Sequence, residues 1–192
     1  MKPKLFLIAG HNGAGKTTFL KEFVKSKKLK YINADEIAQK ISLDRSSLLA
    51  IKAGKISLRK IKKFRNKERN FAVETTLSGK MWKTLISDFK KNNYQITIFF
   101  IYLDTLEEAI RRIAVRINKK GHYISKEDVY RRYFRSTRNF WFIYKNLVDE
   151  WFLINNSGKQ PYLVVYGRKD SYQIVDKESL DKFLSIAKGG GK

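Results

Sequence analysis

The feature that most constrains the fold of this chain is the glycine-rich segment 10–17, GHNGAGKT. It fits the pattern G-x-x-x-x-G-K-[ST] at every fixed position, and it stands between an apolar run at 4–10 and a predicted helix over 17–28. In that context the glycines let backbone N–H groups surround phosphate oxygens, and the helix start contributes its positive dipole end. The segment therefore predicts a phosphate loop that binds a nucleoside triphosphate, ATP or GTP.

The loop residues have separate predicted roles. Lys16 is expected to hold the β- and γ-phosphates, and the Thr17 hydroxyl is expected to ligate Mg²⁺. We expect His11 and Asn12 to be turn-forming residues at the solvent edge of the loop. The predicted nucleotide-binding residues are Gly10, His11, Asn12, Gly13, Ala14, Gly15, Lys16, Thr17 and Thr18.

The rest of the chain alternates between apolar runs and amphipathic segments. Strands are predicted at 4–10, 29–33, 70–75, 94–104 and 150–156, and helices at 17–28, 34–42, 46–69, 78–91, 105–119 and 126–146. This alternation predicts an α/β P-loop NTPase with a mostly parallel sheet flanked by helices. We expect one kinase-like domain over 1–192, with an Arg-rich helical lid at roughly 112–146 and a small β-hairpin plus helix over 159–188.

Composition limits the partners and the compartment. The chain has no cysteine, which excludes disulfides and thiolate metal sites and fits a cytoplasmic protein. No apolar run approaches the roughly 18 residues of a membrane span. The net charge is +23, from 41 Lys and Arg against 18 Asp and Glu. That excess favours an anionic partner such as a nucleotide or nucleic acid, unless it is only a solvated Lys-rich surface, which is most concentrated at 52–69.

Three carboxylates lie at the ends of predicted strands or just beyond them. Asp35 can deprotonate an attacking hydroxyl or can cap the next helix, and the spacing leaves both open. Asp104 can bind Mg²⁺ through water, but the capping of the helix after it is favoured. The residues after Glu74 do not form a typical helix N-terminus, so capping does not explain it. A charge at the end of a buried strand needs a partner. We therefore favour a functional role for Glu74, as a substrate or metal ligand.

Two further patterns bear on function. Leu77-Ser78-Gly79 matches the start of a transporter-ATPase signature, but it follows the phosphate loop too closely and lacks the Gly-Gln that should come next. Arginines recur at helical spacing between 112 and 138, beside an aromatic stripe that can pack. At least one of them is expected to stabilise the migrating phosphoryl group, although a solvated basic face is the alternative. These arginines are Arg112, Arg116, Arg131, Arg135 and Arg138.

Several segments in series resemble a known family. AGHNGAGKTT, INADEIA, AVETTLSGK, IYLD, RIAVRINKKGHYISKEDVYRRYFRSTRN and DEWFLINNSG follow one another over roughly residues 3–158 as in the zeta-toxin-like ATPases or kinases. They are most similar to the bacterial branch often labelled a predicted ABC-type ATPase. The resemblance implies a P-loop kinase fold with a helical lid. In zeta toxins, ATP phosphorylates the 3′-hydroxyl of a UDP-N-acetyl amino sugar, and an antitoxin protein is the implied partner.

The same resemblance implies roles for individual residues. It makes Asp35 the general base, places Glu74 and Thr76 against the substrate, and places Arg116 on the phosphates. Glu74 has water-mediated Mg²⁺ binding as its second predicted role. The predicted catalytic residues are Asp35, Lys16 and Arg116, and the predicted substrate-binding residues are Asp35, Glu74, Thr76, Arg131 and Arg135.

The expected function is ATP-dependent phosphoryl transfer to a hydroxyl of a small molecule, with a UDP-amino sugar as one candidate acceptor and plain ATP hydrolysis as the fallback. A nucleic-acid-linked ATPase or polynucleotide kinase is the alternative that the +23 charge suggests. It is disfavoured because the aromatic residues lie in core-like stripes. A non-catalytic nucleotide-binding regulator is the third hypothesis.

Overall fold

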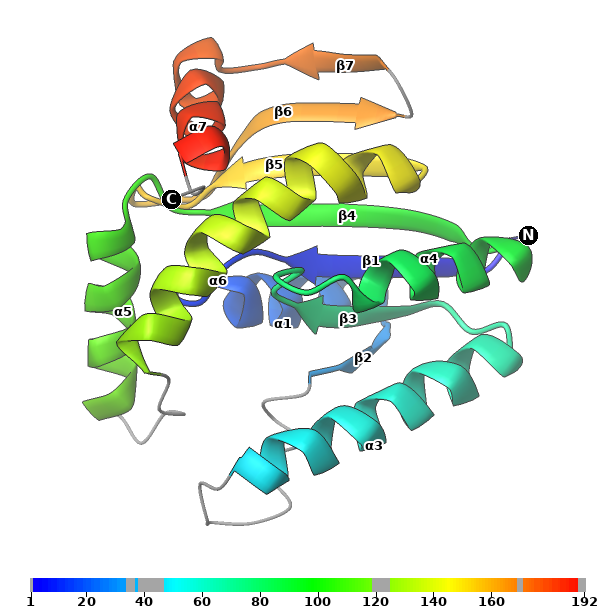
Figure 1. Cartoon of the computed structure of the whole chain (residues 1–192). Coiled ribbons are helices and arrows are strands. Elements are labelled where there is room, and N and C mark those ends of the chain that lie inside the picture. Colours follow the sequence, from blue (N-terminus) through cyan, green and yellow to red (C-terminus); the bar gives the residue numbers. More distant parts are fainter. Residues whose placement is uncertain (1, 34–36, 38–46, 119–124, 169–170, 190–192) are drawn as a thin grey trace.

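The computed structural model describes residues 2–33, 37, 47–118, 125–168 and 171–189, and these contain a seven-stranded sheet (Figure 1). The strand order is β2-β3-β1-β4-β5-β6-β7. The first five strands in this order are parallel, and β6 and β7 extend the sheet in antiparallel fashion. The strands are β1 Lys4–Ala9, β2 Lys30–Ile32, β3 Phe71–Thr75, β4 Gln95–Tyr102, β5 Glu150–Asn155, β6 Tyr162–Arg168 and β7 Ser171–Ile174.

Strand β1 lies at the centre of the parallel part and sets the position of the phosphate loop. Its residue Leu7 pairs with Val73 of β3 on one side and with Ile98 of β4 on the other. Helices cover both faces of these strands, which explains why they are continuous apolar runs with little alternation. Because β1 and β3 run parallel in register, the loop after Ala9 and the residues after Thr75 emerge at the same edge of the sheet.

The helices form two layers. On one face, α1 packs through Leu20 and Val24, while the opposite face carries the larger core under α3, α4 and α7 and the segment after α6 (Figure 1). That larger core includes a stacked pair, Phe100 and Phe140, with ring centroids 4.3 Å apart. The helices are α1 Lys16–Lys27, α3 Ser47–Asn66, α4 Met81–Lys91, α5 Leu106–Asn118, α6 Lys126–Asn139 and α7 Lys177–Gly189.

Some expected boundaries differ from the structure. The predicted helix over 126–146 ends as an α-helix at Asn139 and continues as a π-helical turn, Phe140–Tyr144, and a short 3₁₀ turn, Lys145–Leu147. Helix α4 begins at Met81 and not at position 78, because Leu77 is buried and has a left-handed backbone with φ 54°. The C-terminal hairpin joins the main sheet through β5 and β6. The helix predicted at 34–42 lies outside the described residues, except for position 37.

Among the described helices, none is both long enough and apolar enough to cross a membrane.

Candidate phosphate-binding and acceptor site

The phosphate loop connects β1 to α1, and its glycines are required by positive φ angles and by close backbone contacts. Gly15 is the N-cap residue of α1 and has φ 92°, a left-handed conformation that is costly for other residues. A Cβ added to Gly13, which has φ 82°, would come within 2.7 Å of the Ala109 carbonyl oxygen in α5. The loop is therefore held between its own helix and α5, with its backbone free to face a ligand.

A polar network joins the loop to the end of β3. The Thr17 hydroxyl donates to the Glu74 carboxylate, at 2.9 Å from Oε2 and 3.1 Å from Oε1. Asn33, just beyond β2, donates its side-chain N–H to Glu74 Oε2 at 2.7 Å. The charge at the strand end is thus met by donors from both of these segments, which offsets the cost of partly burying a carboxylate. Lys16 Nζ donates to the His11 carbonyl at 2.8 Å.

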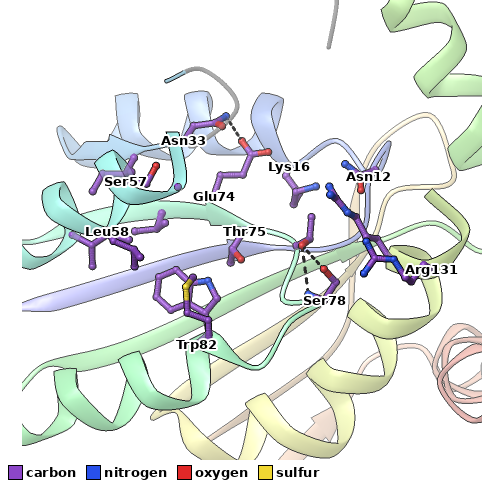
Figure 2. Close-up of a pocket in the computed structure, with 17 residues that line it drawn as sticks. Asn12, Lys16, Asn33, Ser57, Leu58, Glu74, Thr75, Ser78, Trp82 and Arg131 are labelled. Carbon is purple, nitrogen blue, oxygen red and sulfur yellow. Dashed lines mark hydrogen bonds between the residues drawn. The ribbon is translucent and has the colours of Figure 1, made fainter. Parts of the chain in front are cut away.

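Two hollows meet at this network. The first, which we call the phosphate pocket, measures about 140 Å³ and is lined by the loop together with Arg112, Ile113 and Arg116 of α5. The second, which we call the α3–α4 pocket, measures about 460 Å³ and lies between those two helices (Figure 2). Asn12, Lys16 and Glu74 line both. A ligand in one pocket would therefore meet a ligand in the other at these three side chains.

The α3–α4 pocket has a polar end and an apolar wall. Figure 2 shows Arg131 and Ser78 at the end nearest Asn12, with Leu58 and Trp82 at the opposite end. The apolar wall is completed by side chains of β2, β3, α3 and α4, namely Ile32, Val73, Ile61 and Met81. This division suits a ligand with polar groups at the loop and a less polar body against the helices.

The segment after β3 is fastened from both sides. The Thr76 and Ser78 hydroxyls lie 2.9 Å apart, and the Leu77 N–H donates to Thr75 Oγ1 at 3.2 Å. From the segment around the end of α6, Asn139 donates to the Leu77 carbonyl at 3.0 Å, and the Tyr144 hydroxyl donates to the Gly79 carbonyl. These bonds keep the hydroxyls of this turn at the pocket wall.

The expectation that His11 and Asn12 lie at the solvent edge is wrong. His11 is fully buried, and its ring packs against Tyr133 with centroids 4.5 Å apart. His11 Nε2 accepts the Leu103 N–H at 3.0 Å, so Nδ1 carries the proton and donates to the Asn12 carbonyl at 2.9 Å. Burial lowers the pKa of His11 to about 3, although the bond to Asn12 opposes this, and the Lys16 and Arg112 charges lower it further.

Asn12 also points inward but has a different environment. Its side chain is only 4% exposed and lines both pockets, and its Oδ1 has no hydrogen-bond partner among the described residues. An unmatched buried oxygen at the junction of two pockets costs free energy unless a bound group donates to it. The sequence identified Asn12 as a loop residue but gave no sign of this orientation.

The arginines fall into three groups. Arg112 and Arg116 of α5 line the phosphate pocket, and Arg112 also bonds to Glu108 and to the Asn156 carbonyl. Arg131 and Arg132 of α6 line the α3–α4 pocket, and both pair with Asp128. Arg135 is exposed and lines neither pocket.

The structure brings most of the predicted site residues to one edge of the sheet. Thr18 lines the phosphate pocket and Thr76 lines the α3–α4 pocket, whereas Gly10 and Ala14 line neither and serve the backbone of the loop. Asp35, the predicted general base, lies outside the described residues. Site residues that the sequence reasoning missed are Asn33, Ser57, Trp82 and Arg132. Only Arg132 had a usable signal, because it neighbours Arg131 on the Arg-rich helix.

The donor groups fit a nucleotide with a hard divalent cation. Three glycines with positive φ form the cradle, and the Thr17 hydroxyl and Glu74 carboxylate offer oxygen atoms of the kind that Mg²⁺ prefers. In the described part of the chain, no three His, Cys, Asp or Glu side chains gather as a metal cluster. Mg²⁺ in nucleotide sites commonly takes only one or two protein ligands, with phosphates and water completing its shell.

The chain is similar in sequence or in fold to several known proteins. An uncharacterized protein of Haemophilus influenzae is 29% identical over 133 residues, which cover 69% of this chain and 94% of that protein. Crystal structures of the AvrRxo1-ORF1:AvrRxo1-ORF2 complex, with sulphate ions and with ATP, have TM-scores of 0.78 and 0.77, at 15% and 16% identity. Each match covers 96% of this chain but only 64% of the AvrRxo1 chain.

A structure of the PezAT chromosomal toxin-antitoxin system of Streptococcus pneumoniae has a TM-score of 0.65 at 17% identity and covers 98% of this chain and 87% of that chain. These likenesses show the α/β fold of P-loop kinases. The sequence profile described as Zeta toxin matches residues 1–171, which is most of the chain. The chain therefore belongs to the zeta toxin family.

Proposed function

We propose that this protein is an ATP-dependent kinase that phosphorylates a hydroxyl of a small molecule held in the α3–α4 pocket. Family membership and the kinase fold support phosphoryl transfer of the P-loop kinase type. The observation that carries the proposal is that Lys16, Glu74 and Asn12 line both pockets. Phosphoryl transfer consists mainly of positioning two reactants in line and stabilising the charge between them.

The charged groups around the junction suit that task. Lys16 lines both pockets, Arg116 lines the phosphate pocket from α5, and Arg131 and Arg132 line the α3–α4 pocket from α6. In the proposed reaction Lys16 would hold the β- and γ-phosphates, and the arginines would face the migrating group. Together they place cations on both sides of the phosphoryl group, which lowers the energy of the transition state. The Thr17 hydroxyl would hold Mg²⁺, which would supply positive charge to stabilise the transferring phosphoryl group.

Glu74 has two proposed contacts. Its bond to the Thr17 hydroxyl supports a role beside the metal through water, and its place on the wall of the α3–α4 pocket supports a contact with the acceptor. Asp35 remains the predicted general base. Asp35→Ala should abolish transfer while ATP binding stays nearly intact, and transfer at the wild-type rate would show that another group takes the proton.

The acceptor is proposed to be a small molecule of the size that a pocket of about 460 Å³ can hold. A UDP-N-acetyl amino sugar is the first compound to test. An antitoxin protein is proposed as a partner, because the PezAT structure comes from a toxin-antitoxin system. The cytoplasm is the proposed location.

The deciding experiment is incubation of the protein with labelled ATP, Mg²⁺ and a metabolite extract, followed by mass spectrometry for phosphorylated products. UDP-N-acetylglucosamine and GTP serve as a defined acceptor and an alternative donor. We expect a phosphorylated metabolite with the wild type and none with Lys16→Ala. ATP consumption without any phosphorylated acceptor would favour plain hydrolysis, and ATP binding without consumption would favour a nucleotide-binding regulator.

A further inference from the structure

Another hollow, apart from the phosphate pocket and the α3–α4 pocket, has no part in the proposed reaction. It lies between β2 and the C-terminal half of α3 and measures about 610 Å³. We call it the basic groove and define it by its cations, Lys30, Lys60, Lys63, Lys67 and Arg69. Lys30 begins β2, so this end of the groove lies at the amino ends of the strands, opposite the phosphate loop.

The positive charges of the basic groove are not balanced within the described part of the chain. None of the five has an ion pair with another described residue, and no acidic side chain of the described chain lines the groove. The same helix shows the contrast, because Arg65 turns to the other side and pairs with Asp88 of α4. Five like charges around one hollow repel one another, and an anionic occupant would remove that repulsion.

Three of these lysines form a row along α3 and past its end. Lys60 and Lys63 lie three residues apart on one face of α3, and Lys67, which directly follows the last helical residue, lines the same groove. At 1.5 Å of rise per residue, α3 runs about 9 Å from Lys60 to its end at Asn66, so the row is at least that long. This is longer than one phosphate or one carboxylate needs, so the row suits a ligand with several negative charges.

The floor of the groove is apolar. Leu29, Tyr31, Ile32 and Phe64 line it between the cations. Phe64 is half-buried and packs edge-on against Phe71, with centroids 5.1 Å apart, and Tyr31 is half-buried and packs against the core on the α1 side of the sheet. Part of each ring is therefore already covered, which leaves less surface for the base stacking by which proteins usually hold single-stranded nucleic acid.

We propose that the basic groove binds an acidic, partly apolar segment of a partner protein. Carboxylates of the segment pair with the lysine row, and its apolar side chains cover the floor. In an extended segment, alternate residues lie about 6.8 Å apart and point to the same side. In a segment that alternates acidic and apolar residues, the acidic side chains would thus face the lysines and the apolar side chains would face the floor.

The test uses the full chain and a fluorescein-labelled decapeptide that alternates glutamate and leucine. Fluorescence anisotropy is measured with the wild type and with the double variant Lys63→Glu/Lys67→Glu. We expect saturable binding to the wild type and a loss of roughly tenfold or more in the variant, equivalent to about 1.4 kcal/mol. The matched control is Lys83→Glu/Lys91→Glu on α4, which makes the same charge change on exposed lysines outside the groove. It should bind within about twofold of the wild type, as expected for distant surface charges that salt screens.

Three further probes give the proposal clear ways to fail. A peptide with serine in place of leucine should bind more weakly, and equal binding would show that the floor contributes nothing. An equal loss of peptide affinity in the groove variant and in the α4 control variant would show that only the net charge of the protein matters. Oligo(dT) or anionic lipid vesicles could instead bind more tightly than the peptide and lose that binding only in the Lys63→Glu/Lys67→Glu variant. That result would show that the groove binds nucleic acid or a lipid surface and that the proposed occupant is wrong. Thermal unfolding of each variant checks that it is folded.

Discussion

The buried His11 makes the stability of this protein depend on pH in a way that can be measured. In the folded state its pKa is lowered to about 3 by burial, whereas its ordinary value is 6.5. Above pH 6.5 the His11 ring is neutral in both the folded and the unfolded chain, so its protonation has no effect on stability. As the pH falls below 6.5, the unfolded chain gains a proton that the folded chain does not, so stability is lost progressively down to the folded pKa.

The size of the effect follows from the two pKa values. Each pH unit between them changes the free energy of unfolding by about 1.36 kcal/mol. Acidification from pH 7 to pH 5 should therefore remove about 2 kcal/mol through His11. This is a large share of a typical stability of roughly 5–15 kcal/mol.

The assay is urea unfolding at pH 7, 6 and 5, followed by tryptophan fluorescence, with the wild type and His11→Gln. Glutamine can still accept the Leu103 N–H but has no titrating ring. At pH 7 the variant should be less stable by about 1–2 kcal/mol, because it loses the bond to the Asn12 carbonyl and the ring contact with Tyr133. At pH 5 that difference should nearly vanish.

The comparison isolates His11, since carboxylates titrate in both proteins and cancel. The chain has only one other histidine, His122, and replacing it with glutamine in both proteins removes its contribution. A stability difference that stays constant from pH 7 to pH 5 would refute the reasoning, because it would mean that His11 protonates equally well in the folded and unfolded states.

Three other predictions concern the site and the core. Glu74→Gln should lower the rate of transfer by at least about tenfold and raise the Mg²⁺ concentration needed for half-maximal rate. If the metal dependence is unchanged and the KM for the acceptor rises, Glu74 contacts the acceptor instead. Arg132→Ala should reduce kcat by roughly tenfold or more, whereas Arg135→Ala, which changes an exposed arginine outside both pockets, should leave steady-state kinetics as they are. Phe100→Ala should reduce the free energy of unfolding by about 3–5 kcal/mol in denaturant titration, because Phe100 is fully buried and stacked on Phe140; a loss below about 1 kcal/mol would show that the core closes over the gap.

Local patterns were sufficient for much of the fold. The phosphate loop is contiguous, so its glycines, Lys16 and Thr17 could be identified without knowing any distant contact. The alternation of strands and helices likewise predicted an α/β sheet. Element ends were less certain, since the end of α6 and the start of α4 depend on packing: Tyr144 and Asn139 hold the turn before α4 through its carbonyls.

The site itself depends on residues that are far apart in the chain. Thr17 and Glu74 are 57 positions apart, and their hydrogen bond exists because β3 pairs directly with β1. Sequence spacing does not specify that order of strands. The line of Arg131 and Arg135 predicted a cationic helix face, but only the packing of α6 against the sheet places Arg132, and not Arg135, at the pocket.

What the sequence determined by itself is the capacity to bind phosphate, because backbone N–H groups and one lysine in a short loop suffice for it. What the tertiary structure decided is which pocket adjoins the phosphate loop and which loop side chains are withdrawn from solvent. His11 is the clearest case: its loop is glycine-rich and polar, yet Leu103 and Tyr133 bury it, because desolvation is set by neighbours from distant segments.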